Sequence, residues 1–335
     1  MFPALLSLPA RCRGRFRGLA IVTAGLLIAG TADIAIVAAA DSQPAGGEYT
    51  VEPVEGGVEI RLDDQPVARY WASHTAKPIL WPLVGVNGKE LTRGYPMRDA
   101  APSERDDHVH HRSFWMTHGE VNGIDFWAEG EGRGTIKPLG EAKAEGGSTA
   151  TLDARHQWVG PDGKRVLTDR WQLTFDGNGQ QRWIDCVFSL TASEGDVVFG
   201  DTKEGSFGIR VAGTMKVDAG KGGRILNAEG LKNKAAWGKP SPWVDYSGPV
   251  DGQPAGLTIM NHPTSYGYPV RWHVRTYGLF AANPFGVYHF TGGEPTEGKK
   301  LSAGDTWTLR FRVLLHDGQA TAETLEQAWS QYSGK

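Results

Sequence analysis

Short stretches of alternating apolar and polar residues follow one another along the chain from about residue 48. Between Val51 and Leu62 the alternation runs on both sides of a Gly56-Gly57 turn, which predicts a hairpin. The stretch 305–318 predicts a long terminal strand with four apolar residues on one face: Leu309, Phe311, Val313 and Leu315. Gly, Pro, Asp and Asn separate these stretches, which is typical of many short strands joined by turns.

One segment near the end has helical periodicity instead. Its apolar residues are spaced at i, i+3, i+4 and i+7: Leu325, Ala328, Trp329 and Tyr332. Thr321 or Thr324 is suited to cap its start. The stretch 218–248 has no clear periodicity, which predicts a long loop. Together the patterns predict an all-β fold, a large antiparallel β-sandwich (a supersandwich) with one C-terminal helix.

The first forty residues have the pattern of a secretory signal peptide. An apolar run over 18–39 follows four arginines and ends in a small-residue cleavage pattern, Ala38-Ala39-Ala40. We therefore expect a cleaved leader at 1–40, a single β-sandwich domain at 41–335, and a periplasmic or secreted protein. The alternative is an uncleaved membrane anchor, because the run is long enough to span a bilayer.

Charge and cysteine content narrow the function classes. The net charge is −3, and removal of a leader with four Arg and one Asp makes the remainder more acidic. An acidic surface argues against nucleic acid as a partner. No second apolar run is long enough to cross a membrane, so no membrane contact is expected after cleavage. Without Cys12, Cys186 has no disulfide partner, and its strand-like context predicts a buried position.

The densest polar stretch is DDHVHHRSFWMTHGEVNGIDFW, which begins at Asp106. If residues 108–114 form an extended strand, His108, His110 and Arg112 share one face and His111 lies on the other. His110 and His111 would then address different sides unless a bulge intervenes. A His-x-His pair on one face can chelate a metal, so a divalent metal is possible. No H-E-x-x-H pattern occurs, and no cofactor is firmly implied.

The same stretch continues through a turn at Asn122-Gly123. Its polar residues include His118, Glu120 and Asp125, and ionised groups are costly to bury unless they are paired. The stretch therefore suits the wall of a polar cleft better than a core. Three tryptophans are candidates either for stacking on sugar faces or for core packing: Trp115, Trp127 and Trp272.

Two further clusters carry polar residues next to predicted strands. Asp201 and Glu204 precede a strand with Arg210, so they could form an acid–base pair tuned by a cation, or a surface ion pair at a turn. On a strand over 271–277, one face consists of His273, Arg275 and Tyr277, which is unlike a core face. Loops on either side present His262 and Asn283. We expect Arg210 and the His273/Arg275 face to be partners of the histidine-rich wall.

Several catalytic motifs are absent from the sequence. It contains no G-x-S-x-G elbow, no G-x-x-x-x-G-K-[ST] phosphate loop, no G-x-G-x-x-G after a strand and no Cys/His zinc spacing. Serine-hydrolase, nucleotide-dependent and dinucleotide-dependent chemistry are therefore disfavoured.

The histidine-rich stretch, together with WPLVGVNGKELTRGYPM, VRTYGLFAANPFG and LRFRVLLHDG, resembles a bacterial domain family of unknown function over about residues 65–332. That family is often labelled "methane oxygenase PmoA". PmoA-like members look like secreted proteins of polysaccharide-degrading bacteria, which implies a role in carbohydrate metabolism. A weaker similarity is to the galactose mutarotase-like supersandwich, which implies a His and a carboxylate acting on a sugar. Neither resemblance assigns a role to a particular residue here.

The leading hypothesis is a secreted or periplasmic carbohydrate-active enzyme, a hydrolase, lyase or epimerase, with a small-molecule or oligosaccharide substrate. The expected proton-transfer residues are His110, His111, His118, Asp201 and Glu204. The expected substrate-binding residues are Arg112, Glu120, Asn122, Asp125, Trp127, Arg210, His262, His273, Arg275 and Asn283. Two alternatives stay open: a metal-dependent oxygenase or other metalloenzyme with His108 and His110 as ligands, and a non-catalytic glycan-binding protein.

Overall fold

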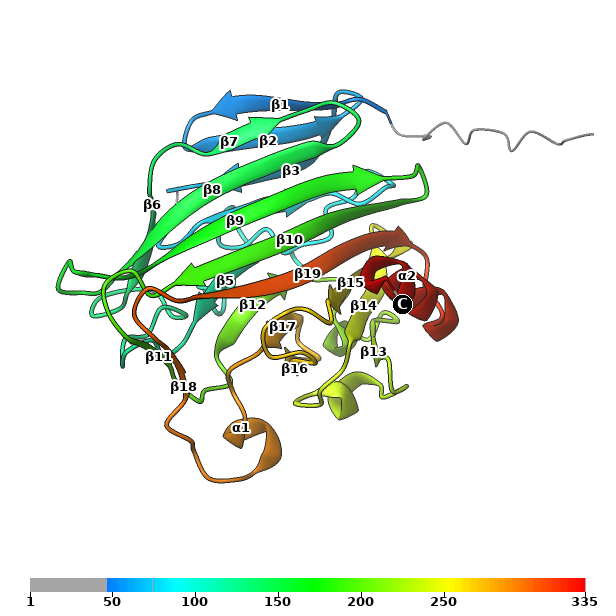
Figure 1. Cartoon of the computed structure of the whole chain (residues 1–335). Coiled ribbons are helices and arrows are strands. Elements are labelled where there is room, and N and C mark those ends of the chain that lie inside the picture. Colours follow the sequence, from blue (N-terminus) through cyan, green and yellow to red (C-terminus); the bar gives the residue numbers. More distant parts are fainter. Residues whose placement is uncertain (1–46, 74, 335) are drawn as a thin grey trace, which may run out of the picture. The chain divides into compact units, whose positions relative to one another are not determined.

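The computed structural model describes residues 47–73 and 75–334, which belong to one compact unit of the chain. The expected signal peptide at 1–40 lies outside the described residues. Within them, two large antiparallel sheets pack face to face as a sandwich (Figure 1). The predicted all-β sandwich is therefore confirmed.

The sheets are described by their strands in spatial order. One has eight strands: β1 (Tyr49–Val54), β2 (Gly57–Leu62), β3 (Gln65–Trp71), β4 (Ile79–Leu83), β5 (Phe114–His118), β12 (Gly205–Arg210), β17 (Leu279–Asn283) and β16 (Arg271–Val274). The other has nine: β13 (Arg224–Asn227), β14 (Trp243–Val250), β15 (Gln253–Asn261), β19 (Thr306–Asp317), β10 (Gln181–Thr191), β9 (Arg165–Gly177), β8 (Ala150–Val159), β6 (Thr135–Pro138) and, also paired with β8, β7 (Lys143–Glu145). A separate two-stranded sheet joins β11 (Val197–Phe199) and β18 (Lys299–Leu301).

Helices are few in the described part. They are α1 (Tyr288–Thr291), α2 (Ala322–Ser333) and the 3-10 helices η1 (Val217–Ala219) and η2 (Asn233–Ala236). No helix among the described residues has the length and apolar character needed to cross a membrane.

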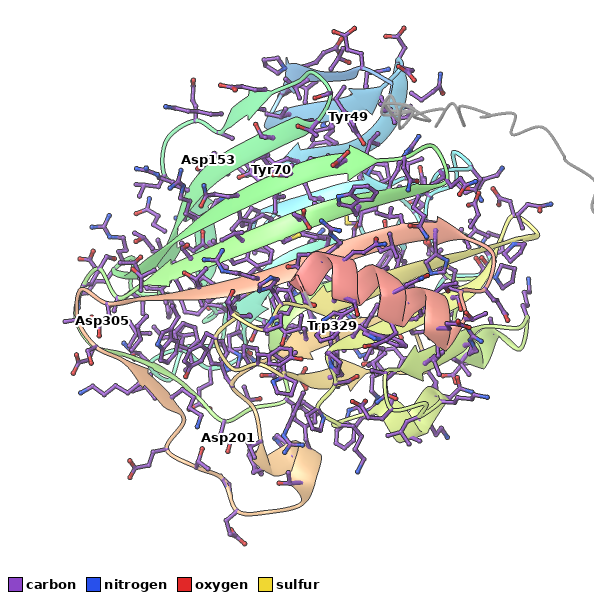
Figure 2. All side chains as sticks on the ribbon, turned by 45° about the vertical axis from the view of Figure 1, so that its right-hand side comes forward. Tyr49, Tyr70, Asp153, Asp201, Asp305 and Trp329 are labelled. Carbon is purple, nitrogen blue, oxygen red and sulfur yellow. The ribbon has the colours of Figure 1, made fainter. Side chains whose placement is uncertain are left out.

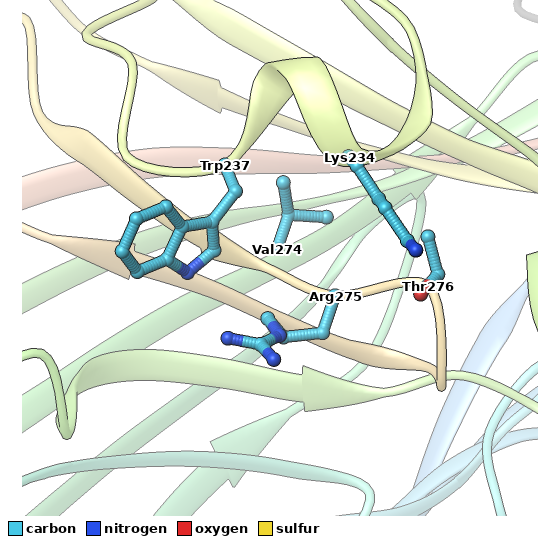
Figure 3. Close-up of a pocket in the computed structure, with 5 residues that line it drawn as sticks. All are labelled: Lys234, Trp237, Val274, Arg275 and Thr276. Atoms are coloured by element: carbon cyan, nitrogen blue, oxygen red, sulfur yellow. The ribbon is translucent and has the colours of Figure 1, made fainter.

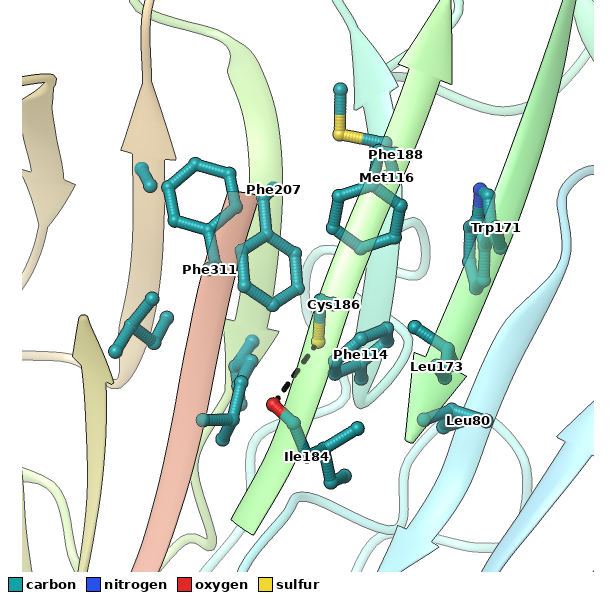
Figure 4. Packing of buried hydrophobic residues seen from close by; sticks show 14 of the residues in the cluster. Leu80, Phe114, Met116, Trp171, Leu173, Ile184, Cys186, Phe188, Phe207 and Phe311 are labelled. Carbon is teal, nitrogen blue, oxygen red and sulfur yellow. Dashed lines mark hydrogen bonds between the residues drawn. The ribbon is translucent and has the colours of Figure 1, made fainter. Parts of the chain in front are cut away.

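Aromatic side chains from both sheets meet in the core. Phe207 of β12 has its ring centroid 4.8 Å from Phe114 of β5, 5.2 Å from Phe188 of β10 and 5.1 Å from Phe311 of β19 (Figure 4). On β10, buried residues alternate with more exposed ones, as expected for a strand with one face on the core. Cys186 lies in the same layer, and burial raises the pKa of its thiol well above the usual range, so it stays protonated.

One polar network is enclosed in this core. The Tyr70 hydroxyl of β3 is 2.7 Å from His156 Nε2 of β8, and His156 Nδ1 is 2.5 Å from Asp169 Oδ1 of β9. Trp158 Nε1 donates to Asp169 Oδ2 over 2.8 Å. Because each of these buried groups has a partner, the network links the two sheets without the cost of an unsatisfied polar atom.

The predicted C-terminal helix is confirmed as α2. Thr321 and Thr324 form its capping box, in which each side chain accepts from the other residue's backbone N–H. Leu325 and Trp329 are buried against a cluster from the nine-stranded sheet, and Trp329 Nε1 donates to Asn261 O over 3.1 Å (Figure 2). The apolar stripe therefore docks on the outer face of that sheet.

The long loop predicted for 218–248 is wrong, because β13, η2 and the start of β14 lie there. On β14, Asp245 is fully buried and accepts hydrogen bonds from Thr258 Oγ1 at 3.0 Å and from His316 Nε2 at 2.9 Å. Neighbouring strands thus supply donors to Oδ1 of a carboxylate that, in the sequence, interrupts the apolar alternation, and Arg224 Nη2 lies 3.8 Å from its Oδ2.

We expect Leu325→Ala to lower the free energy of unfolding by about 2–5 kcal/mol, because it removes a buried side chain that holds α2 on the sheet. Chemical denaturation measures the difference. The control is Gln327→Ala on the exposed side of α2, which should change stability by less than about 0.5 kcal/mol. Equal effects of the two variants would contradict the docking of α2.

Candidate functional site

Four adjacent strands carry a row of residues on the face of the eight-stranded sheet that is turned away from the core. The registers align Trp115 of β5 with Gly208 of β12, Gly208 with Ala281 of β17, and Ala281 with His273 of β16. A Cβ on Gly208 would lie 2.5 Å from Trp115 Cζ2, so the indole occupies the space that a side chain there would need. This sheet order brings the three polar clusters of the sequence to one face.

The histidines over this face lie on a loop, and the predicted strand at 108–114 is wrong. β5 begins only at Phe114, and His108 and Ser113 have φ angles of +47° and +59°. His111 N donates to His108 O over 2.9 Å, which closes a turn. Positive φ is uncommon for residues other than glycine. The turn removes the strand alternation, so His110 and His111 lie together instead of on opposite faces.

Four aromatic rings form a stacked column at the site. The centroid distances are 5.4 Å from Tyr277 to His108, 4.8 Å from His108 to His111, and 5.4 Å from His111 to Trp115, with interplanar angles of 11–15°. His110 meets the column edge-on, 4.5 Å from His111. His111 is buried in the column, whereas 41% of the His108 side chain is exposed.

A single guanidinium, that of Arg93, holds the histidine loop. It donates to Asp107 O and Asp107 Oδ1, both at 3.0 Å, to His108 O at 2.9 Å and to His111 O at 3.3 Å. Arg93 is only 2% exposed, and hydrogen bonds from a charged donor are stronger than neutral ones. Arg93 therefore fixes both the loop backbone and the carboxylate of Asp107.

Arg210 of β12 determines which nitrogen of His111 carries the proton. Arg210 Nη1 lies 3.1 Å from His111 Nδ1, and because arginine only donates, Nδ1 accepts. Burial, assisted by neighbouring cations, lowers the pKa of His111 well below its usual value and keeps the ring neutral. Burial lowers the pKa of Arg210 to about 10, which leaves it charged at neutral pH. The proton of His111 is thus on Nε2, which is a donor.

Asp107 orients the exposed imidazole of His108. Its Oδ1 is 3.2 Å from His108 Nδ1, 3.0 Å from Arg93 Nη1 and 3.4 Å from Arg210 Nη2. Burial alone would raise the pKa of Asp107, but the hydrogen bond from His108 and the two guanidinium charges lower it. An ionised carboxylate only accepts, so His108 Nδ1 carries the proton and Nε2 is left as an acceptor.

Glu204, just before β12, faces the same group of side chains. Its charge acts on His110, His273 and Tyr277, and its carboxylate lies 2.6 Å from Lys203 Nζ. Burial lowers the pKa of both His110 and His273 to about 4, so both are neutral at neutral pH. The structure therefore brings together five predicted site residues: His110, His111, Glu204, Arg210 and His273.

Arg112 forms an ion pair with Glu129 inside the protein. Its Nη2 donates to Glu129 Oε2 over 2.8 Å, and Lys77 Nζ donates to Glu129 Oε1 over 2.8 Å. Burial opposes ionisation of Glu129, but the two cations hold its pKa below the usual value. This cluster ties the loop ahead of β4 to the segment after β5. A substrate contact at Arg112 stays a prediction.

His118, a predicted proton-transfer residue, is enclosed in the protein. Its Nδ1 accepts from Ser206 Oγ over 3.1 Å, and its Nε2 donates to Gly200 O over 2.8 Å. Burial lowers the pKa of His118 to about 4. Both nitrogens of the neutral ring are satisfied, so this position suits a structural role better than contact with a substrate.

Asp201 and Asn283 also stabilise loops. Asp201 accepts from backbone N–H groups within 287–296, and these bonds lower its pKa although burial opposes them. Asn283 accepts from the backbone of 285–286 and donates to Thr202 O over 2.9 Å. Both residues shape the segment that contains α1.

The remaining predicted substrate-binding residues do not contact the ring column as a group: Glu120, Asn122, Asp125, Trp127 and His262. Glu120 and Asn122 are exposed, and Asn122 Oδ1 accepts from the backbone of β11 over 2.7 Å. Asp125 caps the following turn by accepting from the backbone N–H of Trp127 over 2.8 Å. Trp127 is buried against Trp115, as an element of packing. His262 lies beside α2, away from the ring column, at 5.0 Å from Tyr332.

Beside the ring column is a pocket of about 220 Å³, lined by Lys234, Trp237, Val274, Arg275 and Thr276 (Figure 3). The predicted strand 271–277 ends at Val274, and Gly278 N donates to Arg275 O over 3.0 Å to close a turn. The Arg275 guanidinium lies 5.9 Å from the Trp237 ring and 5.5 Å from the Tyr277 ring. Arg275 thus connects the pocket to the column.

The described part of the chain contains no set of side chains arranged as metal ligands. No group of three or more His, Cys, Asp and Glu side chains there is arranged to hold an ion. The rings of His108 and His110 are 5.8 Å apart and edge-to-face, and His108 Nδ1 is directed to Asp107. These two residues do not converge as ligands.

The sequence matches the model of a family of unknown function, DUF6807, over residues 57–330. The chain belongs to this family. A comparison with curated proteins found no match. The description of DUF6807 assigns no activity.

Solved structures similar to this DUF6807 chain include three sugar-related proteins. They are a GH36 α-galactosidase from Geobacillus stearothermophilus (12% identity, TM-score 0.42, 81% of this chain and 41% of that chain), a family 97 glycoside hydrolase variant from Pseudoalteromonas sp. strain K8 (10%, 0.31, 81% and 34%) and a putative aldose 1-epimerase from Escherichia coli K12 (12%, 0.29, 81% and 99%). The chain spans less than half of either glycoside hydrolase. At these TM-scores the likeness carries no argument about activity.

Several residues at the site were not among the predicted site residues: Lys77, Arg93, Asp107, Glu129, Lys234, Trp237 and Tyr277. Asp107 lies within the quoted polar stretch, so its type and place were visible signals. Arg93 and Lys77 act through pairing with distant segments, which no local pattern reveals. Trp237 lies in the stretch for which a loop was predicted.

We expect Arg93→Lys to speed amide hydrogen exchange in 106–111 by roughly tenfold or more, because lysine cannot supply the fork that serves several acceptors at once. Mass spectrometry of exchanged peptides measures the change. Arg98→Lys, whose arginine makes a surface ion pair with Glu90, should leave this segment unchanged. Unaltered protection in Arg93→Lys would show that the loop is held by other contacts.

The pKa values of His110, His118 and His273 are lowered by burial from 6.5 to about 4, which makes stability depend on pH. As pH falls below 6.5 the unfolded chain binds protons at these sites, whereas the folded chain does so only near pH 4. The free energy of unfolding should therefore fall with pH across this window. His118→Gln should flatten the dependence in denaturation experiments, and an unchanged slope would argue against a neutral buried His118.

Proposed function

We propose that this protein is a carbohydrate-active enzyme in which His108 is the general base. The observation that supports it is an exposed imidazole whose Nδ1 is held 3.2 Å from Asp107 Oδ1, leaving Nε2 as an acceptor. Two guanidinium groups hold that carboxylate in turn. An imidazole oriented by a carboxylate is a common general base near neutral pH.

Two side chains next to His108 can act as proton donors, which a reaction with a general base also needs. His111 offers a proton on Nε2, as follows from its contact with Arg210. Burial raises the pKa of Tyr277, so its hydroxyl stays protonated and can donate. Neutral donors next to a base can protonate a leaving group or stabilise a developing negative charge. Glu204 supplies a carboxylate on the same face.

This combination suits acid–base chemistry on a sugar, as a hydrolase, lyase or epimerase. Sugars present many hydroxyl groups to donors and acceptors and apolar ring faces to aromatic side chains. Trp237, partly exposed at the adjacent pocket, is an aromatic surface of this kind. An oligosaccharide or small sugar is therefore the proposed substrate.

We also propose that the enzyme acts in the periplasm or outside the cell. The support is the signal-peptide pattern of residues 1–40, and N-terminal sequencing of the exported protein is the direct test. The PmoA-like label stays a prediction, and methane oxidation is not part of the proposal.

The test is a screen of oligosaccharides with three readouts: release of reducing ends, formation of unsaturated sugar products, and anomer or epimer exchange by NMR. On any substrate found, His108→Gln should lower kcat by about 10²–10⁴-fold, the usual contribution of a general base, with a smaller effect on KM. The readout that responds assigns the reaction as hydrolysis, elimination or epimerisation.

Lys164→Gln, in the exposed turn between β8 and β9, is the matched surface control and should retain full turnover. Unchanged kcat in His108→Gln would reject His108 as the base. Saturable sugar binding without turnover in the wild type would favour the glycan-binding alternative instead.

A further inference from the structure

We infer that the pocket beside the ring column binds the carboxylate of an acidic sugar, so that the substrate contains a uronate residue. This inference rests on the proposed carbohydrate function and adds the chemical class of the substrate. It comes from the charges, the unpaired donors and the position of the pocket.

The charge of the pocket is one-sided. Two of its lining residues, Lys234 and Arg275, are cations, and no carboxylate lines it. Three buried or half-buried arginines nearby are paired with carboxylates, Arg93 and Arg210 with Asp107 and Arg112 with Glu129. In the described part of the chain, by contrast, no carboxylate lies within ion-pair distance of Lys234 or Arg275.

The Arg275 guanidinium also has unused hydrogen-bonding capacity. Its neighbours are the faces of Trp237 and Tyr277, and no described side chain or carbonyl accepts from it. A guanidinium presents a planar fork that matches the two oxygens of a carboxylate. The site is thus built for an anion that the protein itself does not supply.

Trp237 adds a second donor without a partner. Its Nε1 is buried and has no hydrogen-bond acceptor within the described residues. Figure 3 shows the indole nitrogen on the side of the ring that faces Arg275. The guanidinium lies over the indole face, whereas the indole N–H lies in the ring plane, so the two donors are adjacent without pointing at each other. An oxygen of a carboxylate or an adjoining hydroxyl beside the ring can accept from Nε1.

The position of the pocket links this anion site to the proposed base. Arg275 lies 5.5 Å from the Tyr277 ring, which is 5.4 Å from the His108 ring. A volume of about 220 Å³ is below the roughly 300–1,000 Å³ of sites for drug-sized ligands, so it suits the acid end of one sugar residue. A uronate anchored there would place its ring toward His108.

The experiment compares calorimetric binding of short galacturonate and glucuronate oligosaccharides with that of the corresponding neutral galactose and glucose oligosaccharides. The wild type should bind an acidic member more tightly, and its affinity should fall with added salt. Arg275→Gln should weaken acidic binding by roughly tenfold or more, and should weaken it more than neutral binding. Lys234→Gln, at an exposed position, should act in the same direction without endangering the fold.

Lys239→Gln, exposed nearby but outside the pocket, is the matched control and should not alter affinity. Binding or turnover of neutral sugars that ignores Arg275→Gln and Lys234→Gln, without a preference for acidic ones, overturns the inference and leaves the proposed function intact. Arg275-dependent uronate binding without turnover supports the pocket but overturns the enzyme. Binding of sulfated but not carboxylated sugars overturns the carboxylate assignment, and binding of no sugar overturns both proposals.

Discussion

Burial of the Arg93 guanidinium is the constraint on which the arrangement of the site depends. The loop ahead of β5 makes no strand pairs at 108–111, so its carbonyl groups need other donors. Arg93 supplies them from the segment after β4, and the same group neutralises Asp107. One side chain therefore positions the backbone of His108 and His111 and the carboxylate that orients His108.

The fold tolerates this polar cluster on the outer face of the eight-stranded sheet because the inner face of the same sheet packs against the hydrophobic core. Phe114, Phe207 and Trp272 point into the core, while alternate positions of the same three strands carry Trp115, Arg210 and His273 outward. On that outer face a large indole sits next to Gly208 and Ala281. Small residues at the centre of the row therefore allow polar groups from separate strands to approach one another.

The sequence predicts the fold well because its signals are local. The hairpin at β1 and β2, the terminal strand β19 and the helix α2 follow directly from the spacing of apolar residues. The approach of the clusters around His111, Arg210 and His273 could also be foreseen, since the sequence marks all three as polar, although only Arg210 and His273 lie on strands. The positive φ angles of His108 and Ser113 could not, because neither residue type signals them. The pairing of Arg93 with Asp107 depends on tertiary structure alone.

Asp107 carries one negative charge and faces two arginines as well as His108. The cluster is therefore electrically unbalanced even before the imidazole takes up a proton, and each proton gained adds to the excess positive charge. A ligand that brings its own negative charge would restore the balance at the moment when His108 is cationic. The sharing of one carboxylate between two guanidinium groups and an imidazole thus makes this end of the column receptive to a negatively charged ligand.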